Sequence, residues 1–214
     1  HSIRRRQRQM CIRDSNTGVP MQTSANYLAT RQAGLDLLAN FASKAGPDYA
    51  RGRNFDCGPH QPRAVSGLSP YVRRRLIMEQ EVVTEVLKQH SADAAEKFIQ
   101  EVFWRSYWKG WIELRPTVWH GYQTGLRWAL NAVQTQDGLE RNWRSACTGN
   151  TGIDCFDAWA EELTSTGYLH NHARMWFASI WIFTLRLPWE LGADFFLRNL
   201  LDGDPASNTL GWRW

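Results

Sequence analysis

Two short polar clusters in the last quarter of the chain hold the residue types best suited to chemistry. The first, HNHAR, spans residues 170–174, and the second, DGD, spans residues 202–204. An arginine and two aspartates that flank an apolar segment need partners, because an unpaired charge inside a protein is costly. The clusters therefore predict either a satisfied network of ion pairs or a site that holds a ligand.

A second set of candidate residues shares one face of a predicted helix. Glu101, Trp104, Arg105 and Trp108 follow one another at the spacing i, i+3, i+4 and i+7. By itself this pattern is typical of an aromatic stripe that faces the core, with the arginine and the glutamate reaching its edge. On spacing alone, a packing role is the stronger interpretation.

The segment VSGLSPY at residues 65–71 has the pattern of a helix start. Ser69 is followed by Pro70, which fits a serine N-cap and a proline at the first helical position. The exposed backbone N–H groups, the Ser66 hydroxyl and Gly67, which allows close approach, would suit a phosphate group. As an isolated motif it indicates little, because most such helix starts bind nothing.

The elements that must position the two polar clusters are predicted to be helices. Gly167 ends one helix, Asn171 caps the next, and Pro188 marks where that helix ends. Residues 175–187 have apolar side chains on every face, which predicts a helix that is buried all round. It is too short to cross a membrane, which takes roughly 20 apolar residues. A return helix at 191–201 would bring the two clusters side by side.

The rest of the chain predicts further helices and the loops between them. Helical spacing of apolar residues is found at 24–43 with Ser24 as its cap, at 94–114 with Pro116 after it, at 120–135 and at 157–165. The segments 46–62 and 136–151 are predicted to be loops, because they are rich in glycine, proline or polar residues. Since no alternation of period two occurs anywhere, the predicted fold class is all-α.

The net charge of +4 comes from the first residues of the chain. Residues 1–15 carry five arginines and one aspartate, 5 − 1 = +4, and the remainder has 20 basic against 20 acidic residues. Residues 1–20 lack the apolar core of a signal peptide. They are interpreted as a non-native or disordered basic leader, with a basic arm for nucleic acid as the alternative. The globular domain is then 21–214.

Cysteine usage indicates a reducing compartment. Outside the leader the chain has Cys57, Cys147 and Cys155, an odd number without the spacing of a zinc site. Free thiols favour a cytoplasmic location. We expect no metal site and no membrane association, and the sequence leaves the oligomeric state open.

Several of these motifs together resemble one known family. The runs TGYLHNHARM and DGDPASNTLGWRW, with VSGLSPYV and FIQEVFWRSYW upstream, are similar to motifs of the FAD-binding helical domain of DNA photolyases and cryptochromes. The resemblance covers about residues 49–214, with a gapped stretch around 119–143. It implies that the cofactor is FAD, held in a bowl of helices.

The resemblance implies a set of residues that contact FAD. Arg174 would pair with Asp202, Asp204 would hold the polar edge of the flavin ring, and Asn208 would lie beside its N5 atom. The cofactor-binding residues implied in this way are Tyr49, Val65, Ser66, Gly67, Leu68, Phe98, Arg105, Asn171, Arg174, Asp202, Asp204 and Asn208.

The resemblance also implies a light-driven activity on DNA. Light-excited reduced FAD would pass an electron to a cyclobutane pyrimidine dimer, as in a deoxyribodipyrimidine photo-lyase. Trp212 and Trp189 match the two inner members of the family's electron-transfer chain, and Trp143 is the candidate for its outer member. The implied catalytic residues are Trp212, Trp189, Asn208 and Glu101, and those facing the DNA lesion are Trp104, Met175 and Trp214.

Two other functions are compatible with the sequence. A light-sensing flavin module without repair activity would fail to bind DNA that contains pyrimidine dimers. A plain helical domain would use His170, Asn171, Arg174 and Asp202 as a satisfied polar network and would hold no flavin. We also expect a fragment, because no antenna domain precedes the flavin motifs and the family's domain continues beyond GWRW.

Overall fold

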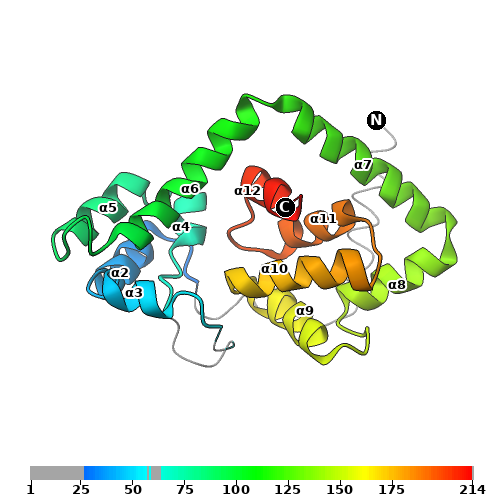
Figure 1. The fold of residues 1–214 in the computed structure, drawn as a ribbon, viewed down its shortest axis with the longest axis horizontal. Helices are drawn as coiled ribbons and strands as arrows, with labels where there is room; N and C mark the ends of the chain where they lie inside the picture. Colours follow the sequence, from blue (N-terminus) through cyan, green and yellow to red (C-terminus); the bar gives the residue numbers. More distant parts are fainter. Residues whose placement is uncertain (1–26, 57, 59–63, 214) are drawn as a thin grey trace.

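The computed structural model describes residues 27–56, 58 and 64–213, and the regular elements within these residues are all helices (Figure 1). In chain order they are α2 (Arg31–Ala42), α3 (Pro47–Gly52), α4 (Ser69–Arg73), α5 (Glu79–Leu87), α6 (Glu96–Glu113), α7 (Pro116–Thr135), α8 (Asp137–Cys147), α9 (Asp154–Thr166), α10 (Asn171–Ser179), η2 (Ile180–Thr184), α11 (Trp189–Asn199) and α12 (Pro205–Trp212). The predicted all-α fold is confirmed. The predicted leader 1–20, Ser24, Cys57 and Trp214 lie outside the described residues.

Two hydrophobic cores divide the molecule. Helices α2 to α5 and the first half of α6 enclose one core, which includes Phe41 and Tyr71. Helices α7 to α12 enclose the other, which includes Phe156 and Trp181. In Figure 1 the long helices α6 and α7 form an arch between the two groups, and α12 lies beneath it. The polar clusters belong to the space between the two cores.

Residues 175–187 do not form the single helix, buried all round, that the sequence predicts. Helix α10 ends at Ser179 and continues as a π-helical turn, η2, after which Arg186 adopts a left-handed conformation with φ of 54°. Met175 and Phe183 are 48% and 76% exposed, so the segment is not buried all round. The buried face carries Phe177 and Trp181, at a spacing of four, and the wider turn lets the Trp181 indole donate to the Pro188 carbonyl at 2.9 Å.

Segment 136–151 is mostly helical, where a loop was expected. Helix α8 places Leu139, Trp143 and Ala146 on one face toward the carboxyl-terminal core. The composition of the segment misled the prediction, because its other faces are polar and solvent-facing. A narrow apolar stripe is enough to fix a helix that packs against a core on one side only.

Helix boundaries differ from the predictions by a few residues. The amino-terminal helix begins at Arg31, not near residue 24, because the Thr30 hydroxyl accepts the Ala33 N–H at 3.2 Å. The caps of two other helices were assigned one residue too late. His170, not Asn171, caps α10 through its Nδ1 atom, and Leu68 precedes α4, so that Ser69 is the first helical residue.

Local contacts fix both ends of α9, and one of them, the Gly167 helix stop, was predicted. Gly167 ends α9 with φ of 68°, the left-handed conformation that favours glycine. At the other end, Asp157 accepts hydrogen bonds from the Thr151 N–H and hydroxyl at 3.0 and 2.7 Å, and from the Gly152 N–H at 2.9 Å. These bonds tie the turn after α8 to the first turn of α9.

Within the described part of the chain, no helix combines the length and the apolar character that a membrane crossing needs. The same residues contain no group of three or more His, Cys, Asp or Glu side chains placed to hold a metal ion.

Candidate functional site

The described members of the two predicted polar clusters meet α4 and α6 in a polar seam between the cores. We call this cluster the seam, defined by Ser69, Arg73, Arg105, Lys109, Arg174, Asp202 and Asp204. Helix α12 packs against α6, and in Figure 1 its start lies between α6 and α10. Residues that are 130 positions apart in the chain meet here, since the Arg73 Nε donates to the Gly203 carbonyl at 2.9 Å.

Asp204 is at the centre of the seam and is 5% exposed. One carboxylate oxygen, Oδ1, caps α12 by accepting two backbone N–H groups at 3.0 and 3.1 Å. The other, Oδ2, faces three cations: Arg73 Nε at 3.3 Å, Arg105 Nη1 at 3.7 Å and Lys109 Nζ at 3.7 Å. One carboxylate can balance only one of these charges.

Arg174 and Asp202 form the second ion pair of the seam, as predicted. The Arg174 Nη2 lies 3.2 Å from each oxygen of Asp202, while its Nε donates to the Leu169 carbonyl at 2.8 Å. Burial acts to raise the pKa of Asp202, but the charge of Arg174 and a hydrogen bond from the Ser69 hydroxyl outweigh it, so the pKa lies below its ordinary value. Asp202 is therefore an anion that keeps Arg174 in place.

The seam carries more positive than negative charge. Arg73, Arg105, Lys109 and Arg174 stand against Asp202 and Asp204, which leaves 4 − 2 = +2. The Arg105 Nη1 is buried and has no hydrogen-bond acceptor among the described residues. Burial lowers the pKa of Arg105 below its ordinary value, because it removes water from the charged guanidinium, while the charges of Asp202 and Asp204 act in the opposite direction. A buried guanidinium without a full set of acceptors is costly, so this arrangement calls for an anionic group.

The residues at the start of α4 lie beside the seam. Ser66 Oγ accepts the Leu68 N–H at 3.3 Å, and Gly67 has φ of 66°, a conformation that L side chains rarely adopt. Leu68 is buried, whereas Val65 is half-buried. Helix α4 has only five residues, so its dipole attracts an anion less than the sequence pattern indicated. For an anion at this place, the hydroxyl groups of Ser66 and Ser69 and the seam cations are stronger hydrogen-bond donors than the amino terminus of α4.

Three of the predicted site residues do not reach the seam. Tyr49 and Phe98 are buried in the amino-terminal core, where their rings meet edge to face at 5.1 Å. Burial, reinforced by the charge of Glu101, raises the pKa of Tyr49 to about 12. Glu101 forms an ion pair with Arg53, whose backbone carbonyl is hydrogen-bonded to the His170 Nε2. Glu101, Arg53 and His170 thus form a polar cluster at the edge of that core, separate from the seam.

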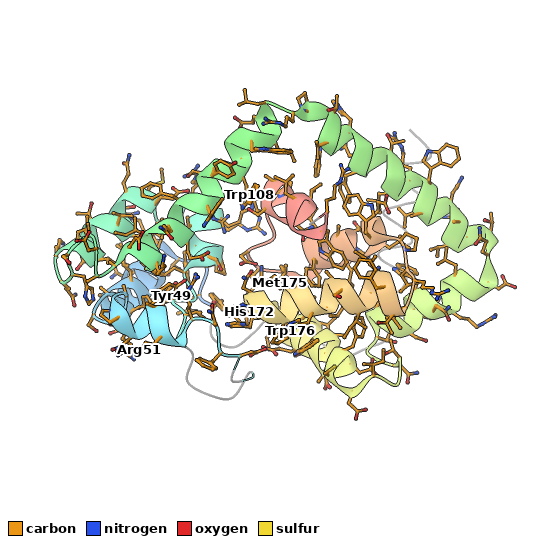
Figure 2. All side chains as sticks on the ribbon, viewed as in Figure 1. Tyr49, Arg51, Trp108, His172, Met175 and Trp176 are labelled. Atoms are coloured by element: carbon orange, nitrogen blue, oxygen red, sulfur yellow. The ribbon has the colours of Figure 1, made fainter. Side chains whose placement is uncertain are left out.

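The two described residues that are predicted to face DNA, Trp104 and Met175, are exposed. Figure 2 shows Met175 on the amino-terminal half of α10 and Trp108 on α6 above it in the view. The Trp104 ring stacks on that of Trp108 with their centroids 5.4 Å apart and lines a groove of about 710 Å³ along α6. Trp104 is 45% and Met175 48% exposed. Asn171 is also exposed, and Trp214 lies outside the described residues.

The predicted electron-transfer residues lie in the carboxyl-terminal half. Trp212 is 5% exposed, and its indole Nε1 has no hydrogen-bond acceptor among the described residues. Trp189 is half-buried and lines the same cavity of about 620 Å³ as Trp212. Asn208 donates its amide N–H to the Ala193 carbonyl at 2.7 Å. Trp143, on α8, makes no aromatic ring contact within the described part of the chain.

Two seam residues were not assigned from the sequence. Arg73 is the first of three consecutive arginines at 73–75. The structure directs Arg73 into the seam, pairs Arg75 with Glu79 at 2.7 Å and leaves Arg74 exposed. Lys109 could have been found from its spacing, since it follows Arg105 by four residues on α6.

Comparison with known proteins identifies the arrangement. Residues 98–214, more than half of the chain, match the family described as the FAD binding domain of DNA photolyase. The chain belongs to this family. FAD is therefore its cofactor.

Photolyases and a cryptochrome share this domain. The deoxyribodipyrimidine photo-lyase of Vibrio cholerae is 26% identical over 181 residues, which are 83% of this chain and 37% of that protein. The class III photolyase of Agrobacterium tumefaciens superposes with a TM-score of 0.70 at 28% identity, covering 86% of this chain and 37% of that one. A Synechocystis cryptochrome shares the fold, with a TM-score of 0.68 at 24% identity over 90% of this chain and 40% of its own. The photolyase-family chain thus spans less than half the length of these relatives.

Proposed function

We propose that the seam holds the FAD diphosphate, in a protein that uses light to repair cyclobutane pyrimidine dimers in DNA. The observation that carries the cofactor site is the buried Arg105 Nη1, which lies 3.7 Å from Asp204 but has no hydrogen-bond acceptor among the described residues, in a cluster with two more cations than carboxylates. When bound, FAD supplies light absorption and the electron that splits the dimer. Repair itself is supported by the photolyase names of the relatives and by the exposed Trp104 and Met175.

The seam residues would divide the work of holding the cofactor. Arg73, Arg105 and Lys109 would donate to the diphosphate, since all three already converge on one carboxylate oxygen. Asp202 holds Arg174, which would present its guanidinium to the flavin as a fixed positive charge. That charge favours an anionic reduced form of the ring.

Trp104 and Met175 would contact the DNA lesion. Aromatic and thioether side chains bind the faces of unstacked bases without reading their sequence, and such contacts are worth about 1–3 kcal/mol per base. Their partial exposure leaves these faces accessible, and the stack of Trp104 on Trp108 fixes the orientation of the Trp104 ring. Trp214 remains a predicted third member of this surface.

Titration with FAD tests the cofactor site. The chain should take up FAD and show the absorption spectrum of a bound flavin, while Arg105→Gln should weaken binding by roughly 10- to 100-fold, since hydrogen bonds to charged groups contribute about 1.5–3 kcal/mol. Arg74→Gln removes an exposed arginine one residue from Arg73 and should leave affinity unchanged. A folded protein that takes up no FAD at high concentration would refute the proposal.

Repair is tested on the FAD-loaded protein with an oligonucleotide that contains a single thymine dimer. Light should restore the thymine absorbance, and the dark control should not. Trp104→Ala should weaken binding of the damaged strand by roughly tenfold, whereas Trp128→Ala, at a position 72% exposed on α7, should not. Flavin photochemistry without any loss of dimers would contradict the repair function.

A light-sensing module without repair is the second candidate. The groove that Trp104 lines also contains Asp93 and Glu96, whose charges repel DNA phosphates. The chain outside its first 15 residues has no surplus of positive charge either. A protein that photoreduces its flavin, but binds damaged and undamaged DNA equally weakly, would have this function.

A further inference from the structure

An aromatic path joins Trp189 to the first turn of α7. The ring of Trp189, the first residue of α11, lies 5.6 Å from that of Tyr122 on α7, centroid to centroid. The ring of Tyr122 lies 5.3 Å from that of Trp119, one helical turn earlier. Trp119 is half-buried, so the path ends near solvent. Trp212 and Trp189 line the same open pocket, so this pocket links the buried Trp212 to the three rings that end at the half-buried Trp119.

The middle ring of this path is unsuited to hold a radical. Tyr122 is 2% exposed, and its hydroxyl has no hydrogen-bond partner among the described residues. Burial raises the pKa of this phenol, with the nearby Asp194 adding to the effect. A phenol that loses an electron becomes a strong acid and forms a stable radical only by passing its proton to an acceptor. Asp194, the carboxylate with the larger effect on this phenol, is paired with Arg198 at 2.9 Å.

A positive charge lies over the ring of Trp189. The Arg213 guanidinium carbon is 5.7 Å from the ring centroid. A cation over an electron-rich indole is attracted to it, but the same cation repels the ring once an electron has left. Arg213 therefore disfavours a positive charge that remains on Trp189 and favours its transfer outward.

We propose that Trp119 is the outer electron donor of this domain, coupled to Trp189 through the ring of Tyr122, which is not itself oxidised. This rests on the proposed function, because bound FAD is the light-excited acceptor. Trp212 gives one electron to the light-excited FAD and then receives one from Trp189. Trp189 in turn receives one electron from Trp119, so the positive charge ends on Trp119. The indole N–H of Trp119 then releases its proton to water. A thiol in solution returns one hydrogen atom, and two thiyl radicals combine as a disulfide.

The test uses the FAD-loaded protein, blue light and a dithiol reductant. Trp119→Phe should slow photoreduction of the flavin by about tenfold or more, equivalent to at least 1.4 kcal/mol in the barrier. Trp128→Phe is the matched control, because Trp128 lies on the same helix, is 72% exposed and has no aromatic ring contact within the described residues. It should photoreduce at the wild-type rate.

Variants of Tyr122 separate a bridge from a radical site. Tyr122→Phe keeps the ring and removes the hydroxyl, so it should photoreduce within about twofold of the wild type, a difference of less than 0.5 kcal/mol in the barrier. Transient absorption and electron paramagnetic resonance should detect a tryptophan radical and no tyrosyl radical, and the tryptophan signal should be lost in Trp119→Phe. Arg213→Gln should lengthen the lifetime of the radical on Trp189.

The outcomes distinguish this proposal from the function on which it rests. A wild-type protein that binds and photoreduces FAD while Trp119→Phe does so equally fast would overturn the Trp119 assignment alone. A tyrosyl radical in the wild type would overturn the bridging role of Tyr122. A protein that takes up no FAD would refute the proposed function itself, and the electron path with it.

Discussion

At the scale of single residues, Asp204 combines two tasks that are usually separate. Its Oδ1 caps α12 and its Oδ2 collects three cations, so the same carboxylate fixes a backbone and organises a charge cluster. A helix cap needs only an oxygen acceptor, whereas the cluster needs a negative charge. A substitution that keeps the oxygen but removes the charge of Asp204 therefore separates its role as a helix cap from its role in the cation cluster.

We predict that Asp204→Asn and Asp204→Ala destabilise the protein by different amounts. Asparagine keeps the cap but leaves Arg73, Arg105 and Lys109 to repel one another. Alanine loses the cap as well and should cost about 1 kcal/mol more. Urea unfolding measures both values. Pyrophosphate should recover part of the loss in Asp204→Asn, and equal stability of the two variants would contradict the dual role.

The Arg174–Asp202 pair gives a second prediction, for the effect of pH. The folded-state pKa of Asp202 is below the ordinary value of 3.8, so the pair contributes stability above that pH and loses it as the pH falls through the folded pKa. Asp202→Asn should cost about 3 kcal/mol at pH 6, because it leaves Arg174 unpaired. Unfolding midpoints at pH 6 and pH 3 should show this cost shrinking at the lower pH, and a constant difference would count against it.

Site residues that belong to a recognised motif could be predicted from the sequence, whereas residues outside the motifs were not assigned. The Arg174–Asp202 pair follows from two motifs at fixed spacing, and the structure contains it. Arg73 was not assigned, since nothing in the run of three arginines at 73–75 shows which of them turns toward the seam. Lys109 was overlooked, although its spacing of four from Arg105 puts both on one face of α6. Phe98 and Tyr49 stay predicted cofactor contacts, and the structure places both side chains in the amino-terminal core. Aromatic residues fit either role, and only the tertiary packing decides between them.

At the scale of elements, the packing of α11 against α12 depends on one glycine. A Cβ on Gly192 would overlap Cη2 and Cζ3 of Trp212, and it would stand 3.0 Å from Trp181. The ring of Trp212 also meets Phe196 at 5.0 Å, so it has little room to move away. Gly192 thus sets how closely the two helices approach.

We predict that Gly192→Ala destabilises the protein by about 1–3 kcal/mol, the usual cost of overpacking a core. It should also shift the fluorescence of Trp212 to longer wavelength, as the ring is pushed toward solvent. Gly211→Ala on α12 is the matched control, since a Cβ there meets nothing within 4 Å, and it should stabilise the helix by up to about 1 kcal/mol. Equal effects of the two substitutions would argue against the contact.

The elements themselves were mostly predictable, for a physical reason. Helices such as α6 and α7 carry an apolar pattern long enough to be recognised, and Gly167 marks its turn through backbone sterics alone. Helix α8 was predicted to be a loop, because only a narrow stripe of its residues is apolar. The π-turn after Ser179 could not be predicted, because it arises where Trp181 reaches the Pro188 carbonyl, a contact that exists only after the chain has folded.

At the scale of the whole molecule, two cores meet across a charged seam. The buried aromatic residues of the amino-terminal core are phenylalanines and tyrosines, whereas the carboxyl-terminal core contains the buried Trp181 and Trp212. Contacts across the seam are mainly ion pairs and hydrogen bonds, which contribute little net stability without a bound anion. The two cores are therefore coupled weakly in the ligand-free protein.

We predict that FAD makes unfolding of the two cores more cooperative. Without FAD, hydrogen exchange at the backbone amides of α5 should report a different denaturant midpoint from exchange at those of α11. Saturating FAD should raise both midpoints and bring them together, because a ligand that binds only the folded seam stabilises both sides at once. The test is a pair of unfolding curves with and without FAD, and coincident midpoints in the free protein would disprove the weak coupling.

The 130-residue separation between Arg73 and Gly203 also has a consequence for synthesis. A ribosome that adds roughly 5–20 residues per second makes the two sides of the seam about 7 to 26 s apart. During that interval the amino-terminal core can fold while its cations still lack Asp204. On the proposed site, flavin loading follows translation, and a ribosome-bound nascent chain stalled before residue 202 should bind no FAD.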